Sequence, residues 1–264
     1  MTLVDKNNNK DNLALLSSYK NHQQTLSSNI SYYQQGMSGR KHLEEFIQGV
    51  YKKYYNADID QFYPNLLAIE SNHQDGVSSQ KNIIKAVAGV RSAEHDTLFS
   101  EYYLSNSLQS EISNRIYGNG NQFIPRDSIV EVGNLAPANI GQMRWLITSI
   151  TGFLYSAGFK YLVFTGVTAI SNSFKRMHIP LELIAEAKQE SLPQNIRDKW
   201  GAEYYKNHPM VFLGDIEKGY KIIKDNIYKS NTQLIPLFEQ ACHVGAQSFH
   251  RVSKESSHLN GKVA

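Results

Sequence analysis

Apolar and polar positions divide the chain into a polar beginning and a series of regular elements. Residues 1–38 are rich in Asn, Gln, Ser and Lys and poor in aliphatic residues, which indicates a mobile extension. Apolar residues then recur at helical spacing and predict an amphipathic helix over 40–55. Two apolar runs, 64–70 and 82–91, stand on either side of a polar turn at 72–81 and predict an antiparallel hairpin.

A strand–helix–strand unit follows later in the chain. Ser128–Val132 reads as a short β-branched strand, and a loop over 134–141 leads into a helix at 142–157 that Gly158 ends. The next strand, 161–165, is apolar throughout, as expected of a strand covered by helices on both faces. The two strands are therefore predicted to be parallel neighbours in a mixed sheet.

Weaker patterns complete a mixed α/β fold with a central β-sheet flanked by helices. They predict helical pieces within 97–116, a helix at 169–177, a strand at 209–213 and C-terminal helices at 217–229 and 232–249. The predicted organisation is a polar extension at 1–38, one α/β domain at 39–216, and C-terminal helices with a basic tail at 217–264.

The positive charge lies at the two ends of the chain. Residues 1–41 carry a net charge of +3 and residues 218–264 a net charge of +4, whereas 42–217 carry −4. Solvated tails explain this distribution, and an acidic partner surface is the alternative. No stripe of Lys and Arg with interleaved aromatic residues occurs, so nucleic-acid binding is not expected.

Missing motifs exclude several functional classes. The single cysteine, Cys242, excludes an internal disulfide framework, and the nine histidines form no metal-binding pattern, so no metal site is expected. The Gly-x-Ser-x-Gly elbow of serine hydrolases and the phosphate-binding loop of NTPases are absent. With no secretory signal and no run of about 20 apolar residues, we expect a cytoplasmic protein without stable membrane insertion.

Three charged residues are candidates for chemistry. Glu131 lies in an apolar strand, where a charge is costly unless it is paired or acts as a base with a raised pKa; a structural acid that holds a loop amide is the alternative. Arg91 ends an apolar strand and is either a carboxylate-binding group or a surface arginine. Glu101, in an aromatic segment, is either a site residue or a solvated helix position.

The surroundings of Glu131 add to its interest. In a strand–loop–helix unit, the loop amides and the helix N-terminus present N–H groups to an anion or a carbonyl oxygen. A carboxylate beside such donors indicates acyl or phosphate chemistry. The aromatic residues from Trp200 to Tyr205 either line an acyl pocket or simply pack.

Seven short motifs, in collinear order between about residues 43 and 214, resemble the bacterial thermostable hemolysin family. They are Phe62-Tyr-Pro-Asn-Leu-Leu67, Ala88-Gly-Val-Arg-Ser-Ala93, Leu98-Phe-Ser-Glu-Tyr-Tyr-Leu104, Ile129-Val-Glu-Val-Gly-Asn-Leu-Ala136, Phe164-Thr165, Asn172-Ser-Phe-Lys-Arg176 and Trp200-Gly-Ala-Glu-Tyr-Tyr205. The family pattern is in turn similar to the GNAT acyltransferase superfamily and, within it, to the acyl-homoserine-lactone synthases.

The resemblance implies a GNAT-like fold and an N-acyltransferase, such as the synthase of a signal or a secondary metabolite. Arg91 and Glu131 match the strand arginine and strand glutamate of the synthases, whereas Asn134 stands where they carry another arginine. The glycine-rich pyrophosphate loop of GNAT enzymes that use acetyl-CoA is not present in 135–141. The implied donor is therefore either acyl-CoA or an acyl carrier protein thioester, and the implied acceptor is a small amine.

The implied reaction is direct acylation of an amine, with no permanently bound cofactor and no covalent enzyme intermediate. A bulge in 129–134 would offer N–H groups to the thioester oxygen, and 135–142 would hold the phosphopantetheine phosphate. Glu131 would remove the amine proton, and Arg91 would bind an acceptor carboxylate. The expected residues are Glu131, Arg91 and Asn134 for catalysis; Val132, Gly133, Leu135, Ala136, Gly141, Gln142 and Asn172 for the donor; and Phe99, Glu101, Arg176 and Trp200 for the substrate.

Two alternatives come from other functional classes. One is a GNAT-like module that binds acyl ligands without catalysis. The other is a membrane-active haemolytic protein, which would need an amphipathic or spanning element. The best candidates for such an element, 217–229 and 232–249, have modest apolar faces, and the second contains Pro236.

Overall fold

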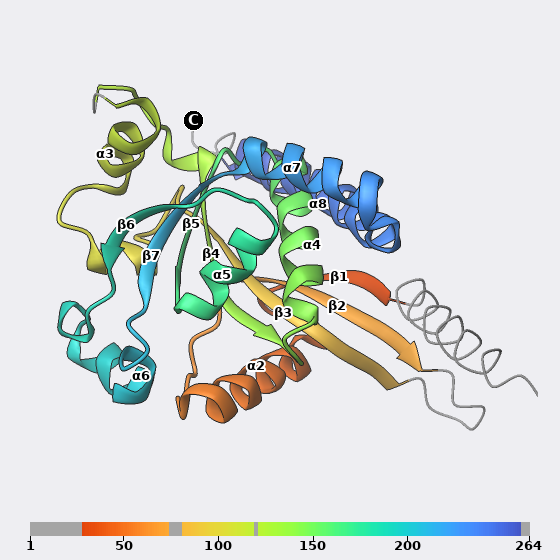
Figure 1. The fold of residues 1–264 in the computed structure, drawn as a ribbon, viewed down its shortest axis with the longest axis horizontal. Helices are drawn as coiled ribbons and strands as arrows, with labels where there is room; N and C mark the ends of the chain where they lie inside the picture. The colour runs from red at the N-terminus through yellow and green to blue at the C-terminus, as the bar shows by residue number, and fades with distance from the viewer. Residues whose placement is uncertain (1–27, 74–80, 119–120, 260–264) are drawn as a thin grey trace, which may run out of the picture.

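The computed structural model describes residues 28–73, 81–118 and 121–259, and it shows one twisted sheet with helices on both faces (Figure 1). Residues 1–27 of the predicted extension at 1–38 and residues 74–80 of the predicted turn at 72–81 lie outside the described residues. The predicted α/β class, a mixed sheet flanked by helices, is confirmed.

The sheet has seven strands in the order β1-β2-β3-β4-β5-β7-β6. All neighbours are antiparallel except β4 and β5, which are parallel, so the predicted strand–helix–strand crossover is confirmed. The strands are β1 (Ser28–Gln34), β2 (Asn65–His73), β3 (Lys81–Ser92), β4 (Ile129–Pro137), β5 (Tyr161–Gly166), β6 (Glu182–Glu186) and β7 (Met210–Asp215).

Helices cover both faces of this sheet. On one face, α4 (Gln142–Ser156), α5 (Thr168–Arg176), α7 (Ile216–Ser230) and α8 (Ile235–Leu259) pack over the largest apolar core. On the other, α2 (Arg40–Tyr55) covers β2 to β4, while the short helices η1 (Phe99–Tyr103) and α3 (Leu108–Ile112), together with α6 (Gln194–Tyr205), cover β4 to β7. The remaining short turns are η2 (Ser113–Tyr117), η3 (Arg126–Ser128), η4 (Gln189–Ser191) and η5 (Thr232–Leu234).

Some sequence expectations need correction. The predicted mobile extension at 1–38 is wrong for 28–34, because these residues form β1, which pairs along its whole length with β2 and buries Ile30. The strand β6 and the helix α6 were not predicted. The C-terminal helices are part of the same core as α4, since Ile223 and Leu237 are buried in it.

A bulge in β4 is the feature that creates the site. Val130 and Val132 both face the core under α4. Ala136 follows Val132 by an even number of residues, so a regular strand would place it on the same face, yet it is buried under α2 on the opposite face. One extra residue therefore interrupts the alternation of the strand. The pairing register with β3 shifts at the same place, and Asn134 has a left-handed backbone with φ of 47°. The predicted loop over 134–141 is thus wrong in its first half, where β4 continues to Pro137.

The strands β4 and β5 separate just before this bulge. Their parallel pairing covers only 129–131 of β4, opposite 161–163 of β5. Beyond Glu131, no strand of the described part of the chain pairs with the edge of β4 that faces β5. Backbone groups and side chains in this opening are therefore available to form a binding site.

Candidate active site

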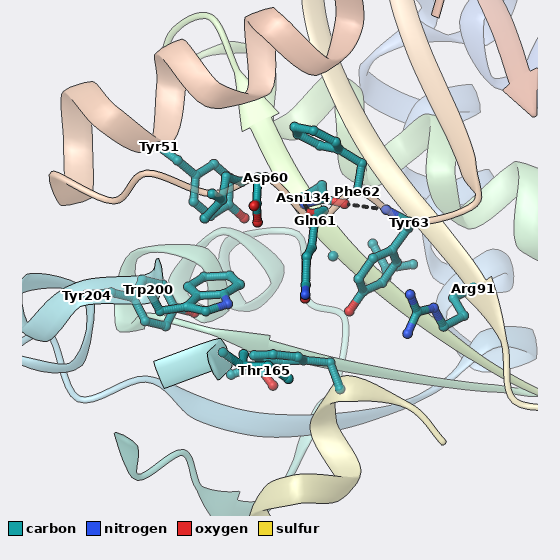
Figure 2. Close-up of a pocket in the computed structure, with 15 residues that line it drawn as sticks. Tyr51, Asp60, Gln61, Phe62, Tyr63, Arg91, Asn134, Thr165, Trp200 and Tyr204 are labelled. Atoms are coloured by element: carbon teal, nitrogen blue, oxygen red, sulfur yellow. Dashed lines mark hydrogen bonds between the residues drawn. The ribbon is translucent and has the colours of Figure 1, made fainter. Parts of the chain in front are cut away.

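A narrow cavity of about 60 Å³ lies at the separation of β4 and β5. Its walls come from β3, β4, β5, α2, α6, η1 and the segment 59–63. Figure 2 shows Trp200 and Tyr204 on one side of the cavity and Tyr63 and Arg91 on the other, with Gln61 extending between them. The site is therefore rich in aromatic rings and has a guanidinium group at one side.

Glu131 is fully buried on β4 and does not line this cavity. Its carboxylate accepts hydrogen bonds from the Phe99 N–H at 2.9 Å, from the Ser100 N–H at 2.6 Å and from the Ser100 hydroxyl. Burial raises the pKa of Glu131 above its ordinary value, and the hydrogen bonds from Ser100, Tyr63 and Phe99 oppose this rise. The residue thus holds the first turn of η1 in place, as the structural alternative had it.

Tyr63 connects the buried carboxylate to the cavity. It lines the cavity, and its hydroxyl lies close enough to the Glu131 carboxylate for each group to shift the pKa of the other. Burial and the negative charge of Glu131 raise the pKa of the phenol well above its ordinary value, so the hydroxyl stays protonated. The ring lies directly against Gly133, where an added Cβ would stand 2.6 Å from Cζ of Tyr63. Gly133 is therefore required for close approach of the ring.

Asn134 positions the wall that carries Tyr63. Its side-chain oxygen accepts a hydrogen bond from the Tyr63 N–H at 2.9 Å, and its side-chain nitrogen donates to the Gln61 carbonyl oxygen at 3.4 Å. Asn134 is buried, and its left-handed backbone at the bulge aims the side chain at this segment. It lines the cavity, but its polar atoms serve the protein's own backbone.

Arg91 stands opposite Glu131 in the β3–β4 register, so both side chains project from the same face of the sheet. Its guanidinium lies over the Tyr63 ring, 4.9 Å from the ring centroid. Among the described residues it forms no hydrogen bond or ion pair with a carboxylate, and it is only partly buried. A half-buried, unpaired guanidinium beside a cavity is suited to bind a ligand carboxylate.

Four other predicted residues, Phe99, Val132, Gly133 and Trp200, also line the cavity. Glu101 does not. It binds the Leu98 N–H at 2.8 Å and forms an ion pair with Arg126 at 2.9 Å. Although burial alone would raise the pKa of Glu101, the hydrogen bonds from Arg126 and Leu98 lower it. Glu101 therefore fixes the start of η1.

The remaining predicted donor residues, and the predicted substrate residue Arg176, lie outside the cavity. Leu135 and Ala136 are buried in the apolar cores on opposite faces of the sheet. Gly141 and Gln142 lie at the start of α4, which has no side-chain cap. Asn172 and Arg176 belong to α5, on the face opposite the cavity. Binding of a donor phosphate by 135–142 stays a prediction.

Sequence reasoning missed Tyr63, Ser100 and Thr165. The Ser100 hydroxyl lies 3.3 Å from the Thr165 hydroxyl, and Thr165 lines the cavity, so a second polar path runs from the cavity to Glu131. All three residues stand within motifs that carry the family resemblance. Their proximity to Glu131 could not be read from the chain, because it depends on how the segment 59–63, β5 and η1 pack.

The sequence profile described as thermostable hemolysin matches residues 33–220, so the chain belongs to the thermostable hemolysin family. No curated protein sequence matches this chain. Within the described residues, no helix is long and apolar enough to cross a membrane. The same part of the chain holds no group of three or more His, Cys, Asp or Glu residues that could bind a metal.

Several solved structures are similar to this chain at low identity. TofI in an apo form is 10% identical with a TM-score of 0.48, over 74% of this chain and 96% of TofI. MesI, a CoA-dependent acyl-homoserine lactone synthase, is 14% identical with a TM-score of 0.43, over 76% of this chain and 96% of MesI. FeeM, an N-acyl amino acid synthase from uncultured soil microbes, is 10% identical with a TM-score of 0.44, over 74% of this chain and 94% of FeeM. At these values the likeness by itself assigns no activity.

Proposed function

We propose that the protein is an N-acyltransferase that moves an acyl group from a phosphopantetheine thioester to the amine of a small acceptor that carries a carboxylate. The observation that carries this proposal is the arrangement at the β4–β5 separation. An unpaired arginine, Arg91, and a phenol backed by a buried acid, Tyr63 with Glu131, meet there beside a bulge in β4.

Arg91 binds the acceptor through its carboxylate. A guanidinium can form two parallel hydrogen bonds with a carboxylate, and partial burial strengthens them by excluding water. Such an anchor holds an amino-acid-like molecule with its amine at a defined distance from Tyr63, which lies under the guanidinium. The acceptor is therefore oriented before the acyl group arrives.

Proton removal passes through Tyr63. Only the neutral amine attacks a thioester, so its proton must leave, and Glu131 is too deeply buried to reach it directly. The Tyr63 hydroxyl accepts the amine proton while it donates its own proton to Glu131. The amine nitrogen bonds to the acyl carbon, the carbon–sulfur bond breaks, and the departing thiolate takes the proton back from Glu131 through Tyr63. The raised pKa of Glu131 makes this carboxylate a better proton acceptor than an exposed one. Ser100 and Thr165 offer a second path of the same kind.

The bulge supplies N–H groups for the thioester oxygen. The Leu135 backbone acts on the hydroxyl of Tyr51, a residue that lines the cavity, and opposes the rise in the pKa of that phenol that burial causes. A thioester oxygen in this place would accept a hydrogen bond from the Leu135 N–H as negative charge develops on it.

The size of the cavity sets a requirement for this mechanism. A volume of about 60 Å³ is below the roughly 300–1,000 Å³ that is usual for ligand pockets. Substrates must therefore displace side chains on binding, and Gln61 is the one that extends furthest between the two walls in Figure 2.

Mass spectrometry tests the proposal. The purified protein is incubated with a set of acyl-CoA thioesters or acyl carrier protein thioesters and a mixture of amino acids and their decarboxylated amines. We expect N-acylated amino acids from the wild type, on the order of 100-fold less product from Tyr63→Phe, and loss of the preference for carboxylates in Arg91→Gln. Arg115→Gln, an exposed change on η2, is the matched control. Absence of any acylated amine with both donors would refute the proposed activity.

A further inference from the structure

The guanidinium of Arg126, at the start of η3, has every one of its N–H groups engaged. It donates from Nε to the Ala93 carbonyl oxygen at 2.7 Å and from Nη2 to the Asp96 carbonyl oxygen at 2.9 Å. Its two terminal nitrogens also bind the two carboxylate oxygens of Glu101, at 2.9 Å each, and Nη1 donates to the side-chain oxygen of Gln109 at 3.3 Å. A guanidinium has five N–H donors, so these contacts use all of them.

These contacts fix the loop at 93–98, which connects the end of β3 with the start of η1. At one end of the loop, Arg126 binds the Ala93 carbonyl oxygen. At the other end, Glu101 accepts a hydrogen bond from the Leu98 N–H at 2.8 Å while it pairs with Arg126. One side chain from the turn before β4 therefore holds the loop at both ends.

The first turn of η1 is the part of this arrangement on which the proposed reaction depends. The N–H groups of Phe99 and Ser100 donate to the two carboxylate oxygens of Glu131, at 2.9 and 2.6 Å. Both N–H groups belong to the turn that Glu101 and Arg126 hold, so a shift of this turn would lengthen both hydrogen bonds. These bonds also oppose the rise in the pKa of Glu131 that burial causes.

Arg126 differs from Arg91 in what it can bind. Arg91 lines the cavity and pairs with no carboxylate of the described residues, so its donors are available to a ligand. Arg126 lies outside the cavity and has no donor left for a substrate. It can therefore act on the reaction only through the position of η1.

We infer that Arg126 is a positioning residue of the acyl-transfer site, which holds η1 so that the amides of Phe99 and Ser100 stay on Glu131. Its effect on catalysis rests on the proposed function, whereas its hold on η1 does not. The replacement Arg126→Lys separates charge from geometry. A lysine keeps the positive charge but has three donors and no planar fork, so it cannot bind both oxygens of Glu101 and the two loop carbonyl groups together.

Two measurements on Arg126→Lys test the inference. Amide hydrogen exchange without substrate follows the segment 98–104, which should exchange at least about 10-fold faster than in the wild type. The pH dependence of kcat is measured with the thioesters and amino acids used to test the proposed function. We expect kcat near neutral pH to fall about 10-fold or more. The acid limb of the profile should move to higher pH, because a carboxylate that loses hydrogen bonds holds its proton more tightly.

The matched control is Ile223→Val, which removes a buried methyl group from α7 on the opposite face of the sheet. It costs stability without touching η1, so neither the exchange of 98–104 nor the acid limb should change. If Arg126→Lys fails to fold, Glu101→Gln weakens the same contacts from the other side. A glutamine has one acceptor oxygen in place of two, so both measurements should change in the same direction and by less.

The outcomes separate this inference from the proposed function. Wild-type exchange of 98–104 in Arg126→Lys would overturn the inference. A lower kcat with an unmoved acid limb would also overturn it, since a merely structural role predicts that result. If the wild type transfers no acyl group, the proposed function is refuted, and faster exchange of 98–104 in Arg126→Lys alone would still support the hold on η1.

Discussion

The replacement Glu131→Gln tests whether this residue holds the site together. Each carboxylate oxygen accepts a hydrogen bond from a backbone amide, one from Phe99 and the other from Ser100. A glutamine must turn its NH₂ group toward one of these N–H donors, whichever way the side-chain amide is oriented. The replacement therefore loses at least one hydrogen bond to a charged group and leaves a buried donor unsatisfied.

That loss costs about 2–3 kcal/mol of unfolding free energy. For a protein of this size it lowers the melting temperature by about 4–12 °C. Urea unfolding of the wild type and the variant measures the difference. Ser100→Ala is the matched control, since it removes the hydroxyl and keeps both amide contacts; it leaves no backbone donor unsatisfied and should cost less, about 1.5 kcal/mol.

The same group makes stability depend on pH. Because burial raises the pKa of Glu131 in the folded state, the folded protein binds the proton more tightly than the unfolded chain. This contribution is fully present below the ordinary value of 4.5 and is lost as pH rises through the raised value. Glu131→Gln should lack this step. An unchanged urea midpoint in the variant, with an unchanged pH profile, would show that Glu131 does not support η1.

Other changes test neighbouring parts of the structure. Gly133→Ala places a Cβ 2.6 Å from the Tyr63 ring, so it should lower the free energy of unfolding in urea by about 1–3 kcal/mol and lower the rate of acyl transfer at least 10-fold. Wild-type stability and activity would mean that the ring has room to move. Deletion of residues 1–38 removes β1 and should cost about 2–5 kcal/mol, whereas an unchanged urea midpoint would show that β1 is dispensable. If the donor is an acyl carrier protein, neutralising Lys218, Lys221 and Lys224 should slow its association with this protein, and the effect should be largest at low salt. Asp215 and Glu217 already pair with the first two, so the effect should be modest, and equal, salt-independent losses with both donors would refute carrier docking.

The amino-acid sequence by itself determined the elements whose apolar period is strong. The helix at 40–55, the hairpin of β2 and β3 and the parallel pair β4 and β5 around α4 are present as predicted. In each case the apolar residues come together on one face only if the segment forms one particular type of secondary structure. Burial of that face then favours that structure. Gly158 ends α4 with a positive φ of 91°, as its C-cap position predicted.

Edge strands were decided by the tertiary structure. The strand β1 has few apolar residues, and β6 is mostly exposed, so neither carries a clear period. The strand β1 forms because β2 offers it free backbone N–H and C=O groups, and β6 forms because β7 does the same. A partner of this kind is distant in the chain and leaves no local pattern.

The site shows the same division. Sequence reasoning singled out Glu131 and Arg91 because a charge within an apolar strand needs a reason, and the β3–β4 register places them opposite each other. Only the packing of the segment 59–63 against the bulge put Tyr63 between Glu131 and the cavity. A single extra residue in β4, at Asn134, reverses which side chains face each core, and no composition or periodicity reveals such an insertion in advance.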